Sequence, residues 1–484
     1  MKKKLILLLV ALLAVGALTA AVIFLNKTDT AESEEEETTT ATVNESRLLY
    51  DKDPKKIQSI EITNSTGSFA VKKYAEDAWL VEGFESIIHD TSLISGLLDS
   101  CATLTASQTA AEKAEDLSVY GLDAPRATVV TTFEDGSVRT LEVGKETPKA
   151  TLTYARSDGG DAVIVVDTSS VEQYLESKFY FLQKTVYTLR QPKDENDKTD
   201  YSKIDKITIE RKDLDYPVVL EYDVRQDDDT IVSGNSSTHV LTSPVRLDLD
   251  PDPAYNIING IFGLTADEVA IVAPSEESLE QYGLLDPACR VTWEIAGESV
   301  TVSFGNEYKD SEGVMQGYFG TADGFDEIFV FGKNNVPWMD FKLEKISMPL
   351  ITTNYIYTVN SFDIKVPDKE YSFSLSGGQD EFAVRCETTG EDMDADLFKG
   401  FYQYFLKAPA EEIYLTPDEA QPLVTVTVKT DTLTDTVEFI DTGDRMCDIR
   451  LNGKTSFRCR KTYVSRLIEN LDRLFAGEEP LTTW

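Results

Sequence analysis

The chain has 484 residues, of which 41% are hydrophobic and 27% charged, so it can bury about three domain cores and is not globally disordered. Its formal net charge of −39 argues against a nucleic-acid-binding protein, because phosphates require a basic surface. The only two histidines are His89 and His239, which almost excludes chemistry that places several histidines on one metal or in one proton relay.

The N-terminus begins with three lysines, Lys2 to Lys4, and continues in an apolar run from Leu5 to Leu25. A helix of about 20 apolar residues crosses a bilayer core, and the preceding lysines favour a cytoplasmic N-terminus. We therefore predict that residues 1–25 form a single-pass anchor in the lipid bilayer of the cell membrane, with the bulk of the chain extracytoplasmic. A cleaved signal peptide is the alternative, although its apolar region is usually shorter, about 7–15 residues.

The segment that follows, residues 26–46, has the composition of a linker. It is rich in threonine and glutamate, lacks aromatic residues and contains the acidic run 34–37. Such a segment cannot bury enough apolar surface to fold, and its charges repel one another. We predict an acidic disordered spacer that holds the folded part away from the membrane.

Two signatures recur in the remaining chain. The first is Tyr-Gly-Leu followed by a proline, at residues 120–125 and 282–287. The second is an apolar helical pattern around a glycine, which occurs three times, at Gly96, Gly260 and Gly400. Glycine within a helix costs about 1 kcal/mol relative to alanine, so we interpret the three glycines as points where a helix approaches a sheet closely.

Alternating apolar and polar stretches, typical of half-buried strands, flank these helical patterns. They begin each repeat at residues 56–62, 203–209 and 361–366, and they recur after the helix at 127–133, 291–295 and 423–428. Asn452-Gly453 predicts a two-residue hairpin turn, and an amphipathic helix with Val464, Leu467 and Leu471 on its apolar face follows it.

These patterns predict an α+β fold of three tandem related modules, each with an antiparallel sheet and helices on one face. The predicted order within a module is β-β-(β)-α-β-β-β-α. We place module one at residues 47–200, module two at 201–350 and a degenerate module three at 351–484.

Five cysteines are present, an odd number whose spacings match no metal or redox motif. We interpret Cys101, Cys289, Cys386, Cys447 and Cys459 mainly as small apolar residues. A two-residue turn at Asn452-Gly453 would place Cys447 and Cys459 one residue out of register, on opposite faces of the hairpin. A disulfide between them would then require a β-bulge.

A search for catalytic motifs finds no dinucleotide fingerprint, phosphate-binding loop, zinc-protease motif or nucleophile elbow. His89 and His239 are interpreted as surface or capping residues rather than catalytic bases. The remaining chemical signal is a set of acidic clusters, for which calcium binding is the alternative to solvated or helix-capping acids. These clusters are Asp227–Asp228–Asp229, Asp248/Asp250/Asp252 and Asp392/Asp394/Asp396, with Asp394 placed to cap a helix. We predict no catalytic, cofactor-binding or metal-binding residues and no enzymatic activity.

The combination of a lysine-led N-terminal helix, the two Tyr-Gly-Leu-x-x-Pro motifs, the strand 141–144 and the aromatic segment 179–181 resembles one family. It is similar to bacterial envelope proteins of the domain-of-unknown-function family forty-three forty (DUF4340), over about residues 45–350. The acidic spacer and the degenerate third module depart from that family's pattern. The resemblance implies an envelope protein associated with gliding-type ABC transporters, and it implies no catalytic residues.

We therefore expect a non-enzymatic, membrane-anchored extracytoplasmic protein, an accessory component of an ABC-type transporter complex. Its expected partners are the lipid bilayer, transporter subunits or other envelope proteins, with no nucleic acid and no cofactor. The alternative is an adhesive or envelope-polysaccharide-binding protein, in which exposed aromatic residues such as Trp338 and Tyr318 would stack on sugars.

Overall fold

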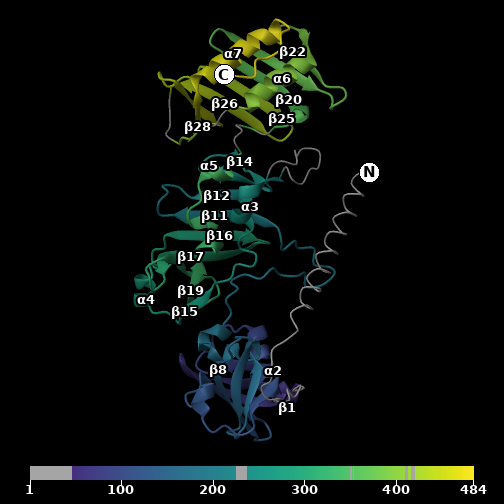
Figure 1. Ribbon diagram of the computed structural model, residues 1–484. Helices are drawn as coiled ribbons and strands as arrows, with labels where there is room; N and C mark the ends of the chain where they lie inside the picture. Colours follow the sequence, from purple (N-terminus) through teal and green to yellow (C-terminus); the bar gives the residue numbers. More distant parts are fainter. Residues whose placement is uncertain are drawn as a thin grey trace, which may run out of the picture.

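The computed structural model of the protein describes residues 46–224, 237–348, 352, 354–408, 412–415 and 420–483. Its strands form three large sheets that follow one another along the molecule in chain order (Figure 1). We use the names module one, module two and module three for the parts built around the first, second and third of these sheets. The predicted anchor and spacer, residues 1–25 and 26–46, lie outside the described residues apart from Ser46.

The elements of module one surround an eight-stranded sheet and a small two-stranded one. They are β1 (Arg47–Asp51), η1 (Pro54–Lys56), β2 (Ile57–Asn64), β3 (Gly67–Ala75), β4 (Ala78–Val81), α2 (Thr91–Ala102), β5 (Thr103–Ala106), β6 (Gln108–Ala111), η2 (Leu117–Tyr120), β7 (Ala127–Phe133), β8 (Val138–Glu146), β9 (Leu152–Ser157), β10 (Val163–Asp167), η3 (Thr168–Ser170), η4 (Glu172–Leu175) and η5 (Lys178–Phe181).

The elements of module two surround a nine-stranded sheet. They are β11 (Ile204–Arg211), β12 (Val218–Tyr222), β13 (His239–Ser243), β14 (Leu247–Asp248), α3 (Pro251–Asn259), β15 (Glu268–Val272), α4 (Glu276–Gln281), β16 (Cys289–Ile295), β17 (Glu298–Lys309), β18 (Met315–Ala322), β19 (Glu327–Gly332), η7 (Lys333–Asn335), η8 (Pro337–Met339) and α5 (Leu343–Ile346).

Module three has a nine-stranded sheet of the same plan. Its elements are η9 (Ile356–Thr358), β20 (Val359–Val366), β21 (Lys369–Ser376), β22 (Ala383–Cys386), β23 (Glu391–Met393), α6 (Ala395–Leu406), β24 (Glu412–Ile413), β25 (Val424–Thr430), β26 (Thr434–Asp441), β27 (Met446–Leu451), β28 (Lys454–Arg460) and α7 (Lys461–Phe475).

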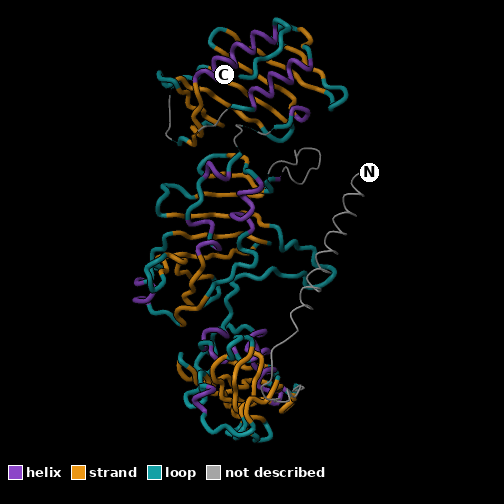
Figure 2. The backbone as a smooth tube through the Cα atoms, viewed as in Figure 1, coloured by secondary structure: helices purple, strands orange, loops and turns teal. Residues whose placement is uncertain are grey.

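The three large sheets share one topology, except that the first lacks the outer strand that β14 and β23 add to the other two. Their strand orders are β4-β3-β2-β7-β8-β9-β10-β6, β14-β13-β12-β11-β16-β17-β18-β19-β15 and β23-β22-β21-β20-β25-β26-β27-β28-β24. In each, two antiparallel meanders meet through their first strands, a helix connects them, and the short strand after the helix joins the far edge. Figure 2 shows the resulting pattern of strand layers with few helices. The predicted antiparallel sheets are confirmed, and with so few helices the fold is α+β or mainly β.

Local sequence explains the central strands. In β2, Ile57, Ile60 and Ile62 are fully buried while polar residues between them face outward, and β11 and β20 show the same pattern. A slip of one residue would turn this apolar set toward solvent, so burial fixes the register. The predicted strands at 56–62, 203–209, 361–366, 127–133, 291–295 and 423–428 correspond to β2, β11, β20, β7, β16 and β25.

The predicted order of elements is wrong after the first helix. After that helix, each large sheet contains one short edge strand and the four strands of a meander, whereas the sequence pattern indicated three strands. Modules one and two close with 3-10 turns and the short α5, and only module three ends in a long helix, α7. In module three, α6 and α7 lie on one face of the sheet, where Tyr404 and Tyr463 stack at 5.1 Å (Figure 1). Among the described helices, none is long and apolar enough to span a bilayer.

The three recurring glycines approach the segments that close each module rather than the sheets, which corrects our interpretation. A Cβ atom on Gly260 would lie 2.7 Å from Cζ2 of Trp338 in η8, and one on Gly400 would lie 2.9 Å from Cγ of Pro480. At Gly96 the nearest atom is Oε1 of Gln173 in η4, at 4.0 Å. Gly96 and Gly400 lie within helices, whereas Gly260 follows the last residue of α3.

The predicted register of the last hairpin holds at the turn, where Leu451 pairs with Lys454, but it is wrong at the two cysteines. Asn452 and Gly453 both have positive φ, as the predicted turn requires, but a β-bulge between Ile449 and Arg450 shifts the pairing. Cys447 therefore lies directly opposite Cys459. All five cysteines are buried, and no disulfide joins them in the described part of the chain.

Modules one and two meet through the segment that follows η5. Thr185 forms an antiparallel bridge with Thr265, and their hydroxyls are 3.0 Å apart. Two backbone hydrogen bonds flank this bridge, from the Val186 amide to the Leu264 carbonyl and from the Ala266 amide to the Lys184 carbonyl, both 2.9 Å. A short strand-like pair therefore connects the two modules.

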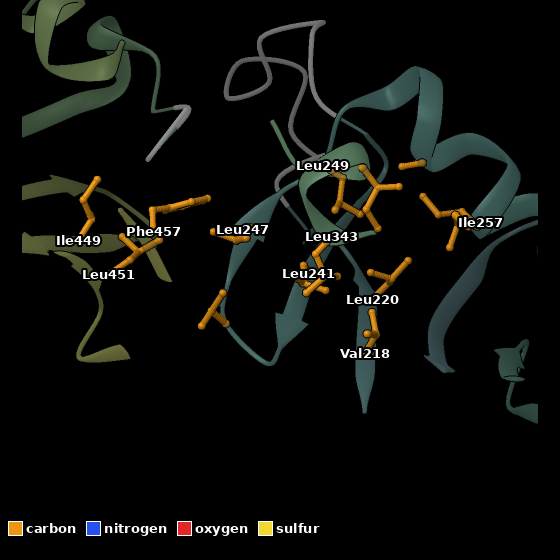
Figure 3. Packing of buried hydrophobic residues seen from close by; sticks show 14 of the residues in the cluster. Val218, Leu220, Leu241, Leu247, Leu249, Ile257, Leu343, Ile449, Leu451 and Phe457 are labelled. Atoms are coloured by element: carbon orange, nitrogen blue, oxygen red, sulfur yellow. The ribbon is translucent and has the colours of Figure 1, made fainter. Parts of the chain in front are cut away.

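Modules two and three share one hydrophobic cluster, whereas most of module one has its own. Figure 3 shows Leu247 of β14 on the side of module two that faces Leu451 and Phe457 of module three. Lys454 also donates a hydrogen bond across this boundary, from Nζ to the Pro244 carbonyl at 3.3 Å. The continuous apolar packing joins the second and third sheets more extensively than the first and second.

One acidic side chain in module two is buried with only partial hydrogen bonding. Glu327, the first residue of β19, is 1% exposed, and its Oε1 has no hydrogen-bond partner among the described residues. Burial raises the pKa of Glu327 to about 7, because a charged carboxylate is poorly solvated there. Between pH 4.5 and about 7, the carboxyl group is therefore protonated in the native state but ionised in the unfolded state, where its pKa is the ordinary 4.5. The resulting stabilisation is fully present below pH 4.5 and is lost as the pH rises through 7.

We expect Glu327→Gln to raise the free energy of unfolding at pH 8 by about 2 kcal/mol and to change it little at pH 5. The glutamine cannot ionise, so the cost of a buried charge disappears at high pH. Urea unfolding at both pH values measures the effect, with the exposed Glu312→Gln as the matched control. An equal pH dependence in the wild type and Glu327→Gln would contradict the assignment.

Candidate functional site

A pocket of about 500 Å³ lies in module one, between the first turns of α2, strand β4 and the turn η1. We call it the module-one pocket. Its wall is mainly apolar, with Trp79, Ile87, Ile94 and Leu98 contributing side chains. Trp79 is held in place by a hydrogen bond from its Nε1 to the Ile57 carbonyl at 3.0 Å. A concave, mostly apolar pocket with few polar groups is the usual form of a binding site.

His89 lines this pocket as a neutral, fully bonded residue. Its Nε2 accepts a hydrogen bond from the Val81 amide at 3.0 Å, so Nδ1 carries the proton and donates to the Ile87 carbonyl at 2.9 Å. Burial lowers the pKa of His89, and its side chain is only 8% exposed. The prediction of a surface or capping histidine is therefore wrong. The cap of α2 is the neighbouring Asp90, which accepts from the Ser92 and Leu93 amides.

A second pocket, of about 420 Å³, lies in module two between β11, β13 and α3. We call it the module-two pocket. His239 lines it, is 3% exposed, and has its Nε2 2.9 Å from the Ile204 carbonyl and its Nδ1 2.9 Å from the Thr238 hydroxyl. Burial lowers the pKa of His239 as well. With both nitrogens bonded and the ring neutral, neither histidine is free to act as a base.

The two pockets occupy the same place in the repeated fold. Register supports this: Val71 pairs with Ile60 and Val81 in module one, as Leu220 pairs with Ile207 and Leu241 in module two. Aligning the helices on Gly96 and Gly260 completes the correspondence. The equivalent lining residues are Lys55 and Ser202, Asp77 and Ser237, Ala78 and Thr238, Trp79 and His239, Thr91 and Tyr255, Ile94 and Ile258, and Ser95 and Asn259.

The chemistry of the two linings differs, although their positions match. The wall formed by Trp79 and Leu98 in module one is apolar, whereas His239, Ser237 and Asn259 give the module-two pocket a more polar wall. At the mouth of the module-one pocket, Lys55 and Asp77 form an exposed ion pair of 3.1 Å. One scaffold therefore presents two pockets with different linings.

The acidic clusters named from the sequence are used in local structure where they are described. Asp394 caps α6 by accepting from the Asp396 and Leu397 amides, which confirms its predicted role, and Asp250 caps α3. Asp392 pairs with Arg385 at 2.8 Å. Among the described residues, no group of three His, Cys, Asp or Glu side chains is placed to hold a metal ion. The run Asp227–Asp229 lies outside the described residues.

The aromatic residues named for sugar stacking are not exposed platforms. Trp338 is fully buried, and its Nε1 donates to the Ile257 carbonyl at 2.9 Å. Tyr318 is partly buried and packs against the same core. The expectation that Trp338 is exposed is therefore wrong, because its ring closes the space beside Gly260.

Sequence reasoning did not identify either pocket. The lining residues come from a turn, a strand and a helix separated by loops, and no linear motif connects them. One signal was available: the chain's only two histidines, His89 and His239, each precede one of the first two glycine-centred helical patterns.

The chain was compared with known protein families. Residues 79–230 match the family described as Domain of unknown function (DUF4340). The match begins at β4, covers the rest of module one and extends beyond β12, so its bounds do not coincide with those of a single sheet. No curated protein and no solved structure matches the chain. The resemblance recognised in the sequence is confirmed for residues 79–230, which match the model of the DUF4340 family.

Proposed function

We propose that the protein is a non-enzymatic accessory component of an ABC-type transporter complex at the bacterial cell envelope. Residues 5–25 anchor it in the membrane, the acidic spacer carries the modules outward, and the modules bind partner proteins. The transporter association is drawn from the family resemblance, and the anchor from the lysine-led apolar run.

The observation that carries this proposal is the equivalence of the module-one and module-two pockets. The same positions of a repeated fold line both, while the side chains at those positions differ. Variation of lining on a constant scaffold is typical of proteins that recognise partners. In both pockets the histidine is neutral and hydrogen-bonded through both ring nitrogens, which favours a binding role over acid–base chemistry.

Crosslinking in intact membranes tests the proposal. The tagged full chain is crosslinked, purified and analysed by mass spectrometry, beside a control chain that keeps residues 1–46 and lacks the modules. We expect a transporter permease or ATPase subunit to be recovered with the full chain and not with the control. Retention of envelope glycans on an array, with no transporter subunit recovered, would instead support the polysaccharide-binding alternative.

A further inference from the structure

Module three shows what can fill the position of the two pockets. Register and the glycine alignment place Tyr357 of η9 at the position of Lys55, and Phe382, just before β22, at the position of Asp77. The Tyr357 and Phe382 rings pack edge to face, with centroids 5.3 Å apart. Two of the chain's own aromatic rings therefore stand where module one has an ion pair.

A cation accompanies these rings. Lys399 of α6, at the position of Ser95 in α2, has its Nζ 5.8 Å from the Tyr357 centroid and 5.3 Å from the Phe382 centroid. An ammonium group this close to a ring face is attracted by the ring quadrupole. In module three the chain itself therefore provides both the rings and the cation. In module one the residue at the position of Lys399 is Ser95, and the pocket is open.

The surroundings of the module-one pocket favour a positively charged ligand. The segment 76–99, which provides most of its lining, carries six acidic residues and contains no lysine or arginine. These acids are Glu76, Asp77, Glu82, Glu85, Asp90 and Asp99. At the pocket itself Lys55 pairs with Asp77, so Asp99 leaves the lining with a net charge of −1. This charge is complementary to a cation, and the apolar wall of Trp79, Ile94 and Leu98 is complementary to a ring.

We infer that the module-one pocket binds an aromatic side chain of a partner polypeptide that carries a lysine or arginine beside it. The incoming ring would take the place that Tyr357 and Phe382 occupy in module three, and the incoming cation would take the place of Lys399. This inference rests on the proposed function, because it treats the modules as binding surfaces. It adds the chemical class of the partner that would bind.

Binding of short amidated peptides to the purified full chain in detergent tests the inference by calorimetry. The probe is Lys-Tyr-Lys, compared with Lys-Ala-Lys and Glu-Tyr-Glu. We expect Lys-Tyr-Lys to bind at least tenfold more tightly than either, and to weaken in 0.5 M salt, because exposed charges are screened. Equal affinity for Lys-Ala-Lys would overturn the role of the ring, and equal affinity for Glu-Tyr-Glu would overturn the role of the cation.

The chain offers matched variants that locate the site. Lys55→Tyr with Asp77→Phe introduces the aromatic pair of module three into module one and should weaken Lys-Tyr-Lys binding at least tenfold. Ser202→Tyr with Ser237→Phe makes the same change in module two and should leave binding unchanged. Loss of binding in the second pair, with retention in the first, would overturn the assignment to module one.

A second pair of variants, with a smaller change in each, serves as the test if the aromatic variants do not fold. Ser95 is exposed, so Ser95→Lys should preserve the fold while placing a cation where the peptide's cation would sit. We expect it to weaken Lys-Tyr-Lys binding, with Asn259→Lys in module two as its control; unchanged binding in Ser95→Lys would overturn the inference. If the peptide does not bind but crosslinking recovers a transporter subunit, only the inference about the pocket is overturned. If the peptide binds but no transporter subunit is recovered, only the proposed transporter role is overturned.

Discussion

Replacement of Asp435 by alanine is expected to lower the free energy of unfolding by about 3 kcal/mol. Asp435, in β26, is 1% exposed and accepts hydrogen bonds at both carboxylate oxygens. Oδ2 accepts from the Thr352 hydroxyl at 2.9 Å and from Asn354 Nδ2 at 2.8 Å, and Oδ1 accepts from Asn452 Nδ2 at 3.0 Å. The alanine variant would remove the acceptor of two buried donors, Thr352 and Asn354, and of the more exposed Asn452.

Loss of the Asp435 carboxylate would affect two modules, because its partners come from both of them and from the segment that connects them. Thr352 and Asn354 belong to the connection between α5 and η9, and Asn452 belongs to the β27–β28 turn. Arg246 of module two reaches the same carboxylate, with Nη1 4.0 Å from Oδ1. Asp435 therefore ties the connection and the second module to the third sheet.

Asp441→Ala is the matched control for this prediction, because Asp441 lies on the same strand and pairs with Lys461 at the surface. Exposed ion pairs contribute about 0–1 kcal/mol, so the control should unfold close to the wild type. Urea unfolding, followed by circular dichroism, measures both variants. Equal destabilisation of the two would show that burial and the three donors do not decide the effect.

Gly260→Ala is expected to destabilise the protein by about 2 kcal/mol, whereas Gly96→Ala should stabilise it by up to about 1 kcal/mol. The new methyl group at Gly260 would lie 2.7 Å from the ring of Trp338, which is fully buried and hydrogen-bonded through Nε1. Neither the ring nor the backbone can move without losing that packing. At Gly96, an exposed position inside α2, the methyl group meets only the end of the Gln173 side chain.

The same substitution at equivalent points of two repeats thus has opposite expected signs. Thermal unfolding of both variants measures the difference, and Trp338→Leu in the Gly260→Ala background should recover part of the lost stability by removing the clash. A stabilising Gly260→Ala would show that Trp338 does not pack as described.

Local patterns in the sequence were sufficient for the central strands and for several turns and caps. The alternation at 127–133 gives β7 its buried face, Asn452-Gly453 forms the turn with two positive φ angles, and Asp394 caps α6. Each of these depends on residues that are neighbours in the chain, so side-chain period and backbone preference determine them.

Elements that depend on distant partners were not predictable in this way. The edge strands β6, β15 and β24 are short and pair with β10, β19 and β28, which follow much later in the chain. The bulge that brings Cys447 opposite Cys459 is likewise a property of two paired strands rather than of either alone. Such pairings have no local periodicity to reveal them.

By itself the sequence determined the repeated antiparallel sheets and the family resemblance of residues 79–230, because alternation and recurring motifs are properties of the linear chain. Only the tertiary structure decided that the recurring glycines face the closing segments, that His89 and His239 are buried, and that equivalent pockets lie in modules one and two. The physical reason is that each pocket is formed by a turn, a strand and a helix whose side chains meet only after the sheet has set their register.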